Sequence, residues 1–388
     1  MKYTQPIHLV DARRSAVGRF GGGLKTLTPA DLALQVGEAV VTANLKPAID
    51  QVIFGQVLQA GAGMNVARQV GLRLGLPQAT PAFTVNMACA SGLKSVALAA
   101  DCIAKGEASL VLAGGVESMS RAPHYAMDLR WGKKIGDGAL VDAMFADGLS
   151  DPVLKLGMGE TAERIADLLK ISREEQDRFA LASQQRAIAN RAAFQREIVP
   201  IKTREGEVVA DEHPRADTTL EKLAQLKPAF RPNGTVTPGN SSGINDGAAL
   251  VLVASETSAK LLGLQPRARI VGATAVGCDP ATMGLGPVGA IRKLCDETGW
   301  QLDGVDAVEI NEAFAVQTLG CAKELQLDMA KLNRRGGAIA LGHPVGCSGA
   351  RVLVTLLHIL EDLKLRRGIA SLCVGGGMGI AMAIEREA

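Results

Sequence analysis

Residues 85–115 read VNMACASGLKSVALAADCIAKGEASLVLAGG, and residues 342–379 read GHPVGCSGARVLVTLLHILEDLKLRRGIASLCVGGGMG. In both stretches a Ser-Gly pair opens a periodic apolar helix, a charged turn follows, and an Ala-Ser-Leu strand runs into glycines. We interpret them as two copies of one strand–turn–helix–strand unit. Two such units that face each other build one shared cleft, and each copy carries a cysteine, Cys89 and Cys373.

Length and composition restrict the class of protein. A chain of 388 residues is too long for one simple core, which suggests two or three domains. The net charge of +2 gives no general attraction to nucleic acid or anionic membranes, so neither partner is expected. The seven cysteines have no CxxC pair and no regular spacing, which argues against a disulfide scaffold or a zinc module. We expect free thiols in a reducing compartment.

The N-terminal residues and the apolar runs indicate where the protein works. The first residues, MKYTQPIHLVDARR, lack the basic-then-apolar pattern of a secretion signal, and Asp11 is untypical of a transit peptide. No apolar run approaches the roughly 20 residues needed to span a bilayer. We therefore expect a soluble, cytoplasmic protein.

Strand and helix patterns alternate from residue 5 to about residue 115. Alternation of this kind predicts a layered α/β domain with a largely parallel sheet. The strand patterns occupy residues 6–11, 51–57, 82–86 and 108–113, and the helix patterns occupy residues 29–43, 63–73 and 91–104.

Between residues 116 and about 235 charges cluster, strand patterns vanish and one long helix is expected at 172–191. We interpret this segment as an insertion, a loop domain over the sheet ends. The segment 235–255 ends in a strong strand and should rejoin the first domain. A helix is expected at 256–262, at the end of the first domain. The second half follows, with strands at 267–276, 305–310 and 369–374 and helices at 287–298, 313–324 and 348–363. The predicted domains are 1–262, which contains the insertion, and 263–388.

Cys89 is the strongest candidate nucleophile. It follows the expected strand 82–86 and stands at a helix entrance. The positive end of a helix dipole and free backbone N–H groups there lower a thiol pKa and bind an oxyanion. The alternative is a small buried core cysteine, the usual fate of this residue type.

His343 and Cys373 complete the candidate chemistry. His343 stands between Gly342 and Pro344 in a constrained loop, where its imidazole could take a proton from Cys89. Cys373 enters a triple-glycine turn, which lets the backbone bring N–H donors to a reacting oxygen. A satisfied loop histidine and a strand-end core cysteine are the alternatives. Two thiols and one imidazole at a shared cleft suit acyl-thioester chemistry.

Three further patterns need an interpretation. Asn311 follows the expected strand 305–310, where it could hold a water or a carbonyl, or cap the next helix. Residues 284–289 match GxGxxG by letter, but no strand leads directly into them, so a nucleotide site is improbable. His343 and Cys347 are four residues apart, but two ligands without a third make no metal site.

Four motifs in this order resemble the thiolase family: VNMACASG around Cys89, NEAFA at 311–315, GHPVGCSGAR around His343 and CVGGGMG around Cys373. The likeness covers nearly the whole chain, including AGGVESMSRAPH at 113–124, MGETAERIA at 158–166 and GNSSGINDGAA at 239–249. The resemblance implies an α/β thiolase fold, in which two similar halves form five αβαβα layers and carry an inserted loop domain.

The resemblance also implies roles for individual residues. Cys89 would carry the acyl group, His343 would activate it, and Cys373 would act as acid and base at the α-carbon. Asn311, through a water, and His343 would form one oxyanion site. The backbone N–H groups of Cys89 and Gly375 would form the other.

The implied activity is a CoA-dependent, reversible condensation or thiolysis of 3-ketoacyl-CoA through an acyl-cysteine, with ping-pong kinetics. The enzyme would be an acetyl-CoA acetyltransferase or acyltransferase of fatty acid metabolism. Coenzyme A would be a substrate, and neither a cofactor nor a metal is expected. A homodimer or homotetramer is expected, because residues 125–140 resemble a segment that pairs dimers in some tetrameric members.

The resemblance places substrate contacts on the loop domain and its neighbours. Two positions depart from the family pattern: Gly157, where members that handle acetoacetyl-CoA tend to have His, and Lys222, where a Ser often contacts CoA. The first departure suggests a roomier acyl pocket. Contacts with CoA are expected at Arg215, Phe230, Ser242 and Gly243, and contacts with the acyl end at Met158, Ala313 and Phe314.

Two other functions are compatible with such a scaffold. A ketoacyl synthase that decarboxylates malonyl thioesters would usually need a second His in place of NEAFA and no second acid/base cysteine. A non-catalytic acyl-CoA or lipid carrier would be favoured if the nucleophile or the base were missing. Because Cys89, His343 and Cys373 are all present, both alternatives rank below a thiolase.

Overall fold

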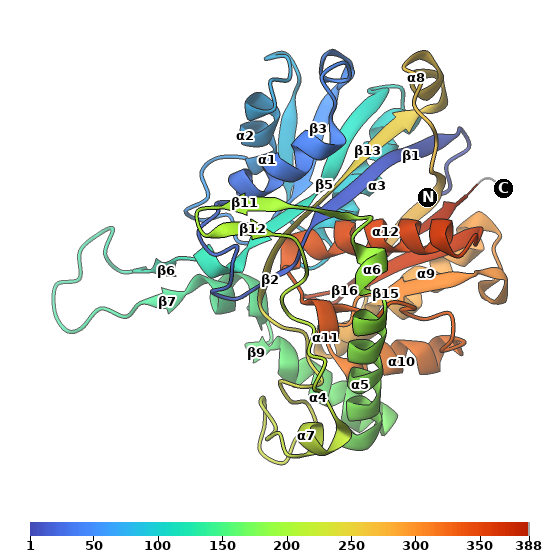
Figure 1. The fold of residues 1–388 in the computed structure, drawn as a ribbon. Helices are drawn as coiled ribbons and strands as arrows, with labels where there is room; N and C mark the ends of the chain where they lie inside the picture. The colour runs from blue at the N-terminus through green and yellow to red at the C-terminus, as the bar shows by residue number, and fades with distance from the viewer. Residues whose placement is uncertain (387–388) are drawn as a thin grey trace.

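The computed structural model describes residues 1–386 and places the two copies of the repeated unit at the centre of the molecule (Figure 1). Their helices, α3 and α12, form the middle of five layers. A sheet covers each side of this pair, and further helices cover each sheet from outside. The helices of these layers are α1 (Pro29–Val40), α2 (Val66–Arg73), α3 (Ser91–Ala104), α9 (Gly286–Thr298), α10 (Ala315–Leu325) and α12 (Val345–Asp362).

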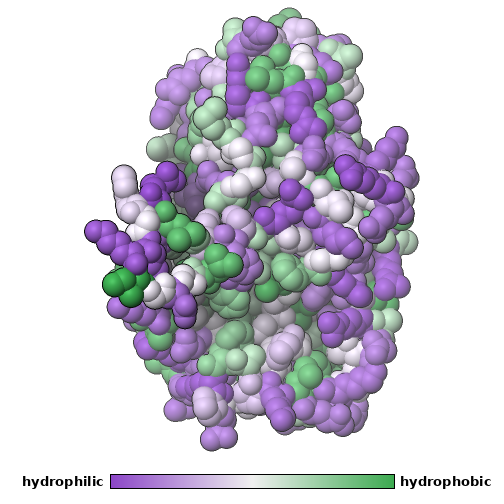
Figure 2. Space-filling model, turned by 90° about the vertical axis from the view of Figure 1, so that its left-hand side faces the viewer, coloured by the Kyte–Doolittle hydropathy of each residue, from purple (hydrophilic) through white to green (hydrophobic). Residues whose placement is uncertain are grey.

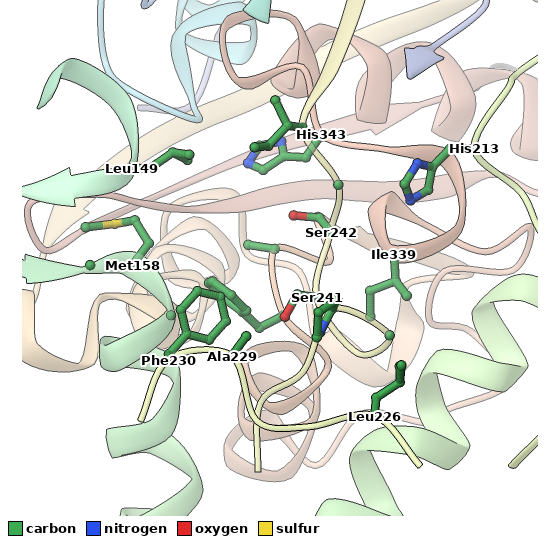
Figure 3. A pocket seen from close by; sticks show the side chains of 18 of the residues that line it. Leu149, Met158, His213, Leu226, Ala229, Phe230, Ser241, Ser242, Ile339 and His343 are labelled. Atoms are coloured by element: carbon green, nitrogen blue, oxygen red, sulfur yellow. The ribbon is translucent and has the colours of Figure 1, made fainter. Parts of the chain in front are cut away.

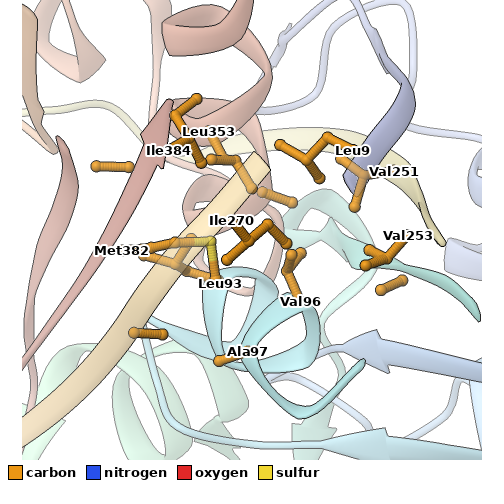
Figure 4. Close-up of a cluster of buried hydrophobic side chains, with 14 of the residues drawn as sticks. Leu9, Leu93, Val96, Ala97, Val251, Val253, Ile270, Leu353, Met382 and Ile384 are labelled. Atoms are coloured by element: carbon orange, nitrogen blue, oxygen red, sulfur yellow. The ribbon is translucent and has the colours of Figure 1, made fainter. Parts of the chain in front are cut away.

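The buried side chains group in the way that five layers require. One cluster fills the space between the two sheets and combines α3 and α12 with strand residues of both halves (Figure 4). A second cluster packs α1 and α2 against the outer face of the N-terminal sheet. A third packs α9 and α10 against the outer face of the C-terminal sheet. The five-layered thiolase fold expected from the sequence is therefore confirmed.

The strands form one continuous order, β15-β16-β17-β14-β1-β13-β5-β3-β4, with a short ladder between β1 and β14 that joins the halves. Only the ends of this order, β4-β3-β5 and β15-β16, are parallel, whereas the central pairs are antiparallel. The parallel sheet predicted for residues 5–115 is confirmed for β4-β3-β5, but it is wrong for β1, which joins them through β13, a strand antiparallel to both β1 and β5. The strands are β1 (Ile7–Ser15), β3 (Gln51–Gly55), β4 (Ala82–Val85), β5 (Leu110–Ser118), β13 (Asn245–Ser255), β14 (Ala268–Gly277), β15 (Ala307–Ile310), β16 (Arg367–Val374) and β17 (Met378–Glu385).

The strand β17 of the central sheet was not expected from the sequence. The glycines after Cys373 form a tight turn, in which Gly376 and Gly377 have φ values of +86° and +83°. The chain then returns as β17 and pairs with both β16 and β14. The predicted strand in 235–255 does rejoin the first half, because β13 lies between β1 and β5.

The inserted segment is mainly helical but not free of strands. Its long helix α5 has Ser172 as its N-cap, and the Ser172 hydroxyl and Glu175 form a reciprocal capping box, which agrees with the helix expected at 172–191. The expectation that strands vanish is wrong, because short ladders pair β6 with β7, β8 with β9 and β11 with β12. The remaining elements are β2 (Gly18–Arg19), β6 (His124–Tyr125), β7 (Val141–Asp142), β8 (Ser150–Asp151), β9 (Leu156–Gly157), β10 (Ile198–Val199), β11 (Ile201–Thr203), β12 (Gly206–Val208), α4 (Met158–Leu169), α5 (Arg173–Ala189), α6 (Arg191–Phe194), α7 (Leu220–Ala224), α8 (Glu256–Leu261), α11 (Ala338–Leu341), the π-helical turn η3 (Phe145–Leu149) and the 3-10 turns η1 (Lys46–Ala48), η2 (Met119–Arg121), η4 (Pro280–Leu285) and η5 (Leu302–Gly304).

A thin arm between β6 and β7 projects from the molecule on the left of Figure 1. It carries large exposed hydrophobic side chains, including Trp131 at 91% and Ile135 at 90% exposure. Figure 2 views the molecule from this side and shows green hydrophobic patches among the purple surface. Within residues 1–386, no helix is both long and apolar enough to cross a membrane.

The two central helices touch at equivalent glycines of the repeat. A Cβ on Gly92 of α3 would lie 2.8 Å from the backbone nitrogen of Ala350 on α12. A Cβ on Gly349 of α12 would lie 2.4 Å from the backbone nitrogen of Leu93 on α3. Because backbone atoms cannot move aside as a flexible side chain can, both positions require glycine.

We predict that Gly92→Ala and Gly349→Ala each lower the free energy of unfolding by at least about 1–3 kcal/mol, because overpacking displaces the helix backbones. Chemical denaturation measures the change. Gly138→Ala is the matched control, since a Cβ there would meet no atom within 4 Å. Equal stability of all three variants and the wild type would contradict the close contact.

Candidate active site

A cavity of about 550 Å³ lies where the N-terminal ends of the two central helices meet the inserted segment. Cys89, which precedes α3, and His343, which precedes α12, both line it. Figure 3 shows His343 at the top of this cavity, with Met158 and Phe230 of the inserted segment on one side and His213 on the other. The shared cleft expected from the duplication therefore exists, and both halves contribute to it.

The loop that carries Cys89 is held in an uncommon backbone conformation. Ala88 has a φ of +43°, in the left-handed region that residues with a Cβ rarely adopt. Its N–H donates to the side-chain oxygen of Asn86 at 2.9 Å, and its carbonyl accepts from the Ser91 hydroxyl at 2.7 Å. The Ser91 oxygen also accepts from the N–H of Met87 at 2.8 Å. These three bonds fix the turn and present the Cys89 side chain to the cavity.

The Cys89 thiol is protonated at neutral pH in the free protein. Burial raises its pKa to about 11, although the backbone N–H groups of Gly375 and of Cys89 itself point at the sulfur and oppose this shift. The charge of the buried Glu117 carboxylate raises the pKa further. The prediction that the helix entrance lowers this pKa is therefore wrong, because α3 begins only at Ser91 and desolvation dominates.

His343 is buried and neutral. Burial lowers its pKa to about 3, and the positive charge of Arg351 adds to the effect. Its backbone N–H donates to the Asn245 side chain at 2.9 Å. Its Nδ1 atom lies 2.5 Å from the hydroxyl of Ser348, and its Nε2 atom lies 3.4 Å from the amide nitrogen of Asn311. A neutral imidazole with a free lone pair can accept a proton from a thiol.

Asn311 lies directly behind His343 and keeps one polar atom unpaired. Its side-chain oxygen is fully buried and has no hydrogen-bond partner among the described residues. Asn311 does not cap a helix, because α10 begins at Ala315 and its N-cap is Phe314. A buried amide oxygen without a hydrogen-bond partner is unusual, and it can accept a hydrogen bond from a water.

Cys373 and Gly375 lie at the end of β16, behind the cavity wall. The Cys373 side chain is fully buried, and burial raises its pKa well above the usual value, with a further contribution from the charge of Cys89. The Gly375 N–H donates to the Cys89 sulfur, which links this turn to the nucleophile loop. Asn311, Cys373 and Gly375 thus adjoin the cavity from behind instead of lining it.

The other residues predicted from the resemblance line the wider part of the cavity. The rings of Phe230 and Phe314 meet edge to face, with centroids 5.9 Å apart. Gly159 has no room for a Cβ, which would lie 2.2 Å from the Phe230 ring. Predicted lining residues found there are Met158, Arg215, Phe230, Ser242, Gly243, Ala313 and Phe314.

Several lining residues were not predicted as site residues. His213 lines the cavity beside Gly243, and burial lowers its pKa to about 4 with help from the positive charges of Arg215 and Arg19. Phe145 and Leu149 come from η3 in the insertion, where no motif marks them. Gly157, noted only as a departure from the family, lines the cavity next to Met158.

The GxGxxG match at 284–289 has a packing explanation. A Cβ on Gly286 would lie 2.1 Å from the carbonyl oxygen of Met378, so this glycine allows α9 to approach β17. The match spans the end of η4 and the start of α9 and follows no strand directly. It is therefore not a nucleotide-binding turn.

Comparison with known proteins agrees with this geometry. The family model described as "Thiolase, N-terminal domain" matches residues 7–257, and "Thiolase, C-terminal domain" matches residues 264–386. The chain is 50% identical to an acetyl-CoA acetyltransferase of Chromobacterium violaceum over 98% of this chain and 99% of that protein. It is 48% identical to a probable acetyl-CoA acyltransferase of Staphylococcus aureus over 97% of this chain and 98% of that protein.

Solved structures give the same result. The crystal structure of human mitochondrial 3-ketoacyl-CoA thiolase in complex with CoA has a TM-score of 0.97 and 44% identity, and covers 100% of both chains. The crystal structure of the Bacillus anthracis acetyl-CoA acetyltransferase has a TM-score of 0.96 and 45% identity, with the same coverage.

These comparisons identify an acyltransferase. The chain belongs to the thiolase family.

We predict that alkylation of Cys89 by iodoacetamide in the free enzyme accelerates about tenfold per pH unit between roughly pH 7 and pH 9, because only the thiolate reacts. The alkylation rate rises with pH because the raised pKa of Cys89 keeps the thiol protonated across this range. Peptide mass spectrometry measures the rate at Cys89.

A Cys89→Ser variant gives the background from the other partly exposed thiols, Cys102, Cys278 and Cys295. A rate that is flat across the range would contradict the prediction, since it would indicate a thiolate paired with an imidazolium in the free enzyme.

Proposed function

We propose that this thiolase uses Cys89 as the acyl-carrying nucleophile, His343 as its base and Cys373 as the acid and base at the α-carbon. The observation that carries the proposal is the convergence of Cys89 and His343, from opposite halves of the chain, on one cavity with Cys373 behind them. The reaction is the reversible thiolysis of 3-ketoacyl-CoA, or the condensation of two acyl-CoA molecules, through an acyl-cysteine.

In thiolysis, His343 removes the Cys89 proton as the sulfur attacks the 3-keto carbon. The bond between the α- and β-carbons breaks, and Cys373 donates a proton to the α-carbon of the departing acetyl-CoA enolate. Coenzyme A then takes the shortened acyl group from Cys89. In condensation, the thiolate form of Cys373 removes the α-proton of acetyl-CoA. The enolate then attacks the carbonyl carbon of acetyl-Cys89, and the bond from this carbon to the Cys89 sulfur breaks as the sulfur takes a proton from His343.

Two oxyanion sites would stabilise the charge that develops in these steps. The N–H groups of Cys89 and Gly375 already point at the Cys89 sulfur, which supports a role as donors to the oxygen of a tetrahedral intermediate. His343, after it takes the Cys89 proton on Nε2, would donate to the enolate oxygen together with a water held by Asn311, and the unpaired Asn311 oxygen supports this role because it can accept from that water. Removing one such donor typically costs roughly 10²–10³ in rate.

We assign the wide part of the cavity to CoA. Arg215 and Lys222 bring positive charge to it, which suits the phosphates, while Phe230 and Phe314 suit the pantetheine chain. A relative of 44% identity has been solved in complex with CoA, which supports this assignment. Near Cys89 the wall is apolar or small at Met119, Leu149, Gly157 and Val345, which suits acyl chains longer than acetyl.

We also propose a cytoplasmic homotetramer that needs no cofactor besides its substrate coenzyme A. All seven cysteines are free thiols, and this chemistry needs reduced thiols, which supports a reducing compartment. Trp131 and Ile135 on the projecting arm expose apolar surface of the kind that pairs proteins. A role in fatty acid metabolism follows from the proposed substrates.

We predict that Cys373→Ser keeps the exchange of labelled CoA into acetyl-CoA, which needs only acylation of Cys89, and loses condensation by at least about 10²-fold, the usual contribution of acid–base catalysis. Thiolysis of 3-ketoacyl-CoA substrates with four to sixteen carbons measures the overall activity of the wild type. Loss of exchange with condensation intact would reverse the two roles, and no turnover at any chain length would refute the function.

We predict that Trp131→Glu converts the tetramer to dimers, because a charge on the arm opposes the apolar contact between dimers. Light scattering coupled to size-exclusion chromatography measures the mass. Met64→Glu, another highly exposed apolar residue outside the arm, is the control and should leave the mass unchanged. An unchanged mass of the Trp131 variant would contradict the role of the arm.

A further inference from the structure

A serine at the start of α12 holds the catalytic histidine by its second nitrogen. Ser348 is fully buried, and its hydroxyl oxygen lies 2.5 Å from Nδ1 of His343 and 2.9 Å from the carbonyl oxygen of Pro344. No role was assigned to Ser348 from the sequence.

The two contacts of this hydroxyl decide where its hydrogen points. A carbonyl oxygen can only accept, so the contact with Pro344 requires the single hydroxyl hydrogen of Ser348. The contact with His343 must then run the other way, with Nδ1–H donating to the serine oxygen. The neutral imidazole therefore carries its proton on Nδ1 and a lone pair on Nε2.

The opposite side of the ring agrees with this assignment. Nε2 of His343 lies 3.4 Å from the amide nitrogen of Asn311, which can only donate. Both neighbours therefore favour the tautomer in which Nε2 accepts a proton. Neither contact depends on the other, since Ser348 and Asn311 come from different elements, α12 and the segment after β15.

The duplicated unit gives an internal comparison. Ser91 occupies the equivalent Ser-Gly position at the start of α3, and its hydroxyl bonds to Met87 and Ala88 of the nucleophile loop. Each copy thus uses its first helical serine to bond back to the loop before the helix. In the first copy that loop carries Cys89, and in the second it carries His343.

We propose that Ser348 is a positioning residue that locks His343 in the Nδ1–H tautomer and so presents the lone pair of Nε2 as the base. The proposal deepens the proposed function, because it rests on His343 acting as the base for Cys89. Ser348 itself touches no reacting atom in this account.

The direct test is the tautomer of His343, measured by NMR on enzyme with isotope-labelled histidine, with the signal assigned by its loss in His343→Asn. The expected result for the wild type is a proton on Nδ1 and none on Nε2. A proton on Nε2 in the wild type would overturn the proposal, and this measurement needs no folded variant of Ser348.

The kinetic test is Ser348→Ala in the exchange of labelled CoA into acetyl-CoA. We expect kcat to fall by roughly 10- to 100-fold, a part of the 10²–10⁴ that acid–base catalysis supplies. KM should change less than about threefold, because Ser348 makes no contact with the substrate. A fall in kcat with little change in KM separates an effect on catalysis from an effect on binding. Ser348→Thr keeps the hydroxyl and should recover most of kcat.

Thr355→Val is the matched control, since it removes another buried hydroxyl of α12, one that bonds to Glu197 at 3.1 Å. It should lower the melting temperature without lowering kcat. If Ser348→Ala also changed only the melting temperature, the hydroxyl would be merely structural and the proposal would fail. If His343→Ala retained exchange, the proposed role of His343 as the base would fail instead.

Discussion

The contact between the first turns of α3 and α12 is the constraint on which the rest of the structure depends. Gly92 and Gly349 occupy equivalent places in the two copies of the repeat, and each leaves room only for the backbone of the other helix. The loops before these helices are therefore forced together. Because one loop carries Cys89 and the other His343, the packing of the middle layer also brings the thiol and the imidazole to one cavity.

Burial sets the chemistry of this assembled site. Desolvation raises the pKa of Cys89 to about 11 and lowers that of His343 to about 3, so both groups are neutral before substrate binds. Burying a neutral thiol and imidazole costs little free energy, whereas a thiolate–imidazolium ion pair would have to offset the desolvation of both charges. Charge then develops only during reaction, where the N–H groups of Cys89 and Gly375 are already directed at the site.

The sequence predicted those features that are local or repeated. Helix positions followed from apolar periodicity, and Cys89, His343 and Cys373 stood out because glycines and strand ends marked their loops. The antiparallel centre of the sheet could not be predicted in this way, because alternation of strands and helices says nothing of which strands pair. The triple-glycine turn after Cys373 was predicted, but the strand β17 that returns from it was not.

Other parts of the site depend on distant packing. The insertion folds over the cavity, and only for this reason does the cavity wall include Phe145, Leu149 and His213. No local sequence pattern predicts this folding. The direction of the Cys89 pKa shift was wrongly predicted for the same reason, since burial comes from segments far away in the chain. Ser348 had a visible signal in the repeated Ser-Gly pair, but its bond to His343 required the structure.

The central claim is that the duplicated fold makes Cys89 the carrier of the acyl group. The most direct measurement is mass spectrometry of peptides from enzyme incubated with acetyl-CoA alone and then with added CoA. We predict an acetyl group on the peptide that contains Cys89, and its removal by CoA. An acetyl group on a different cysteine, or no covalent adduct in an enzyme that still turns over, would contradict the account.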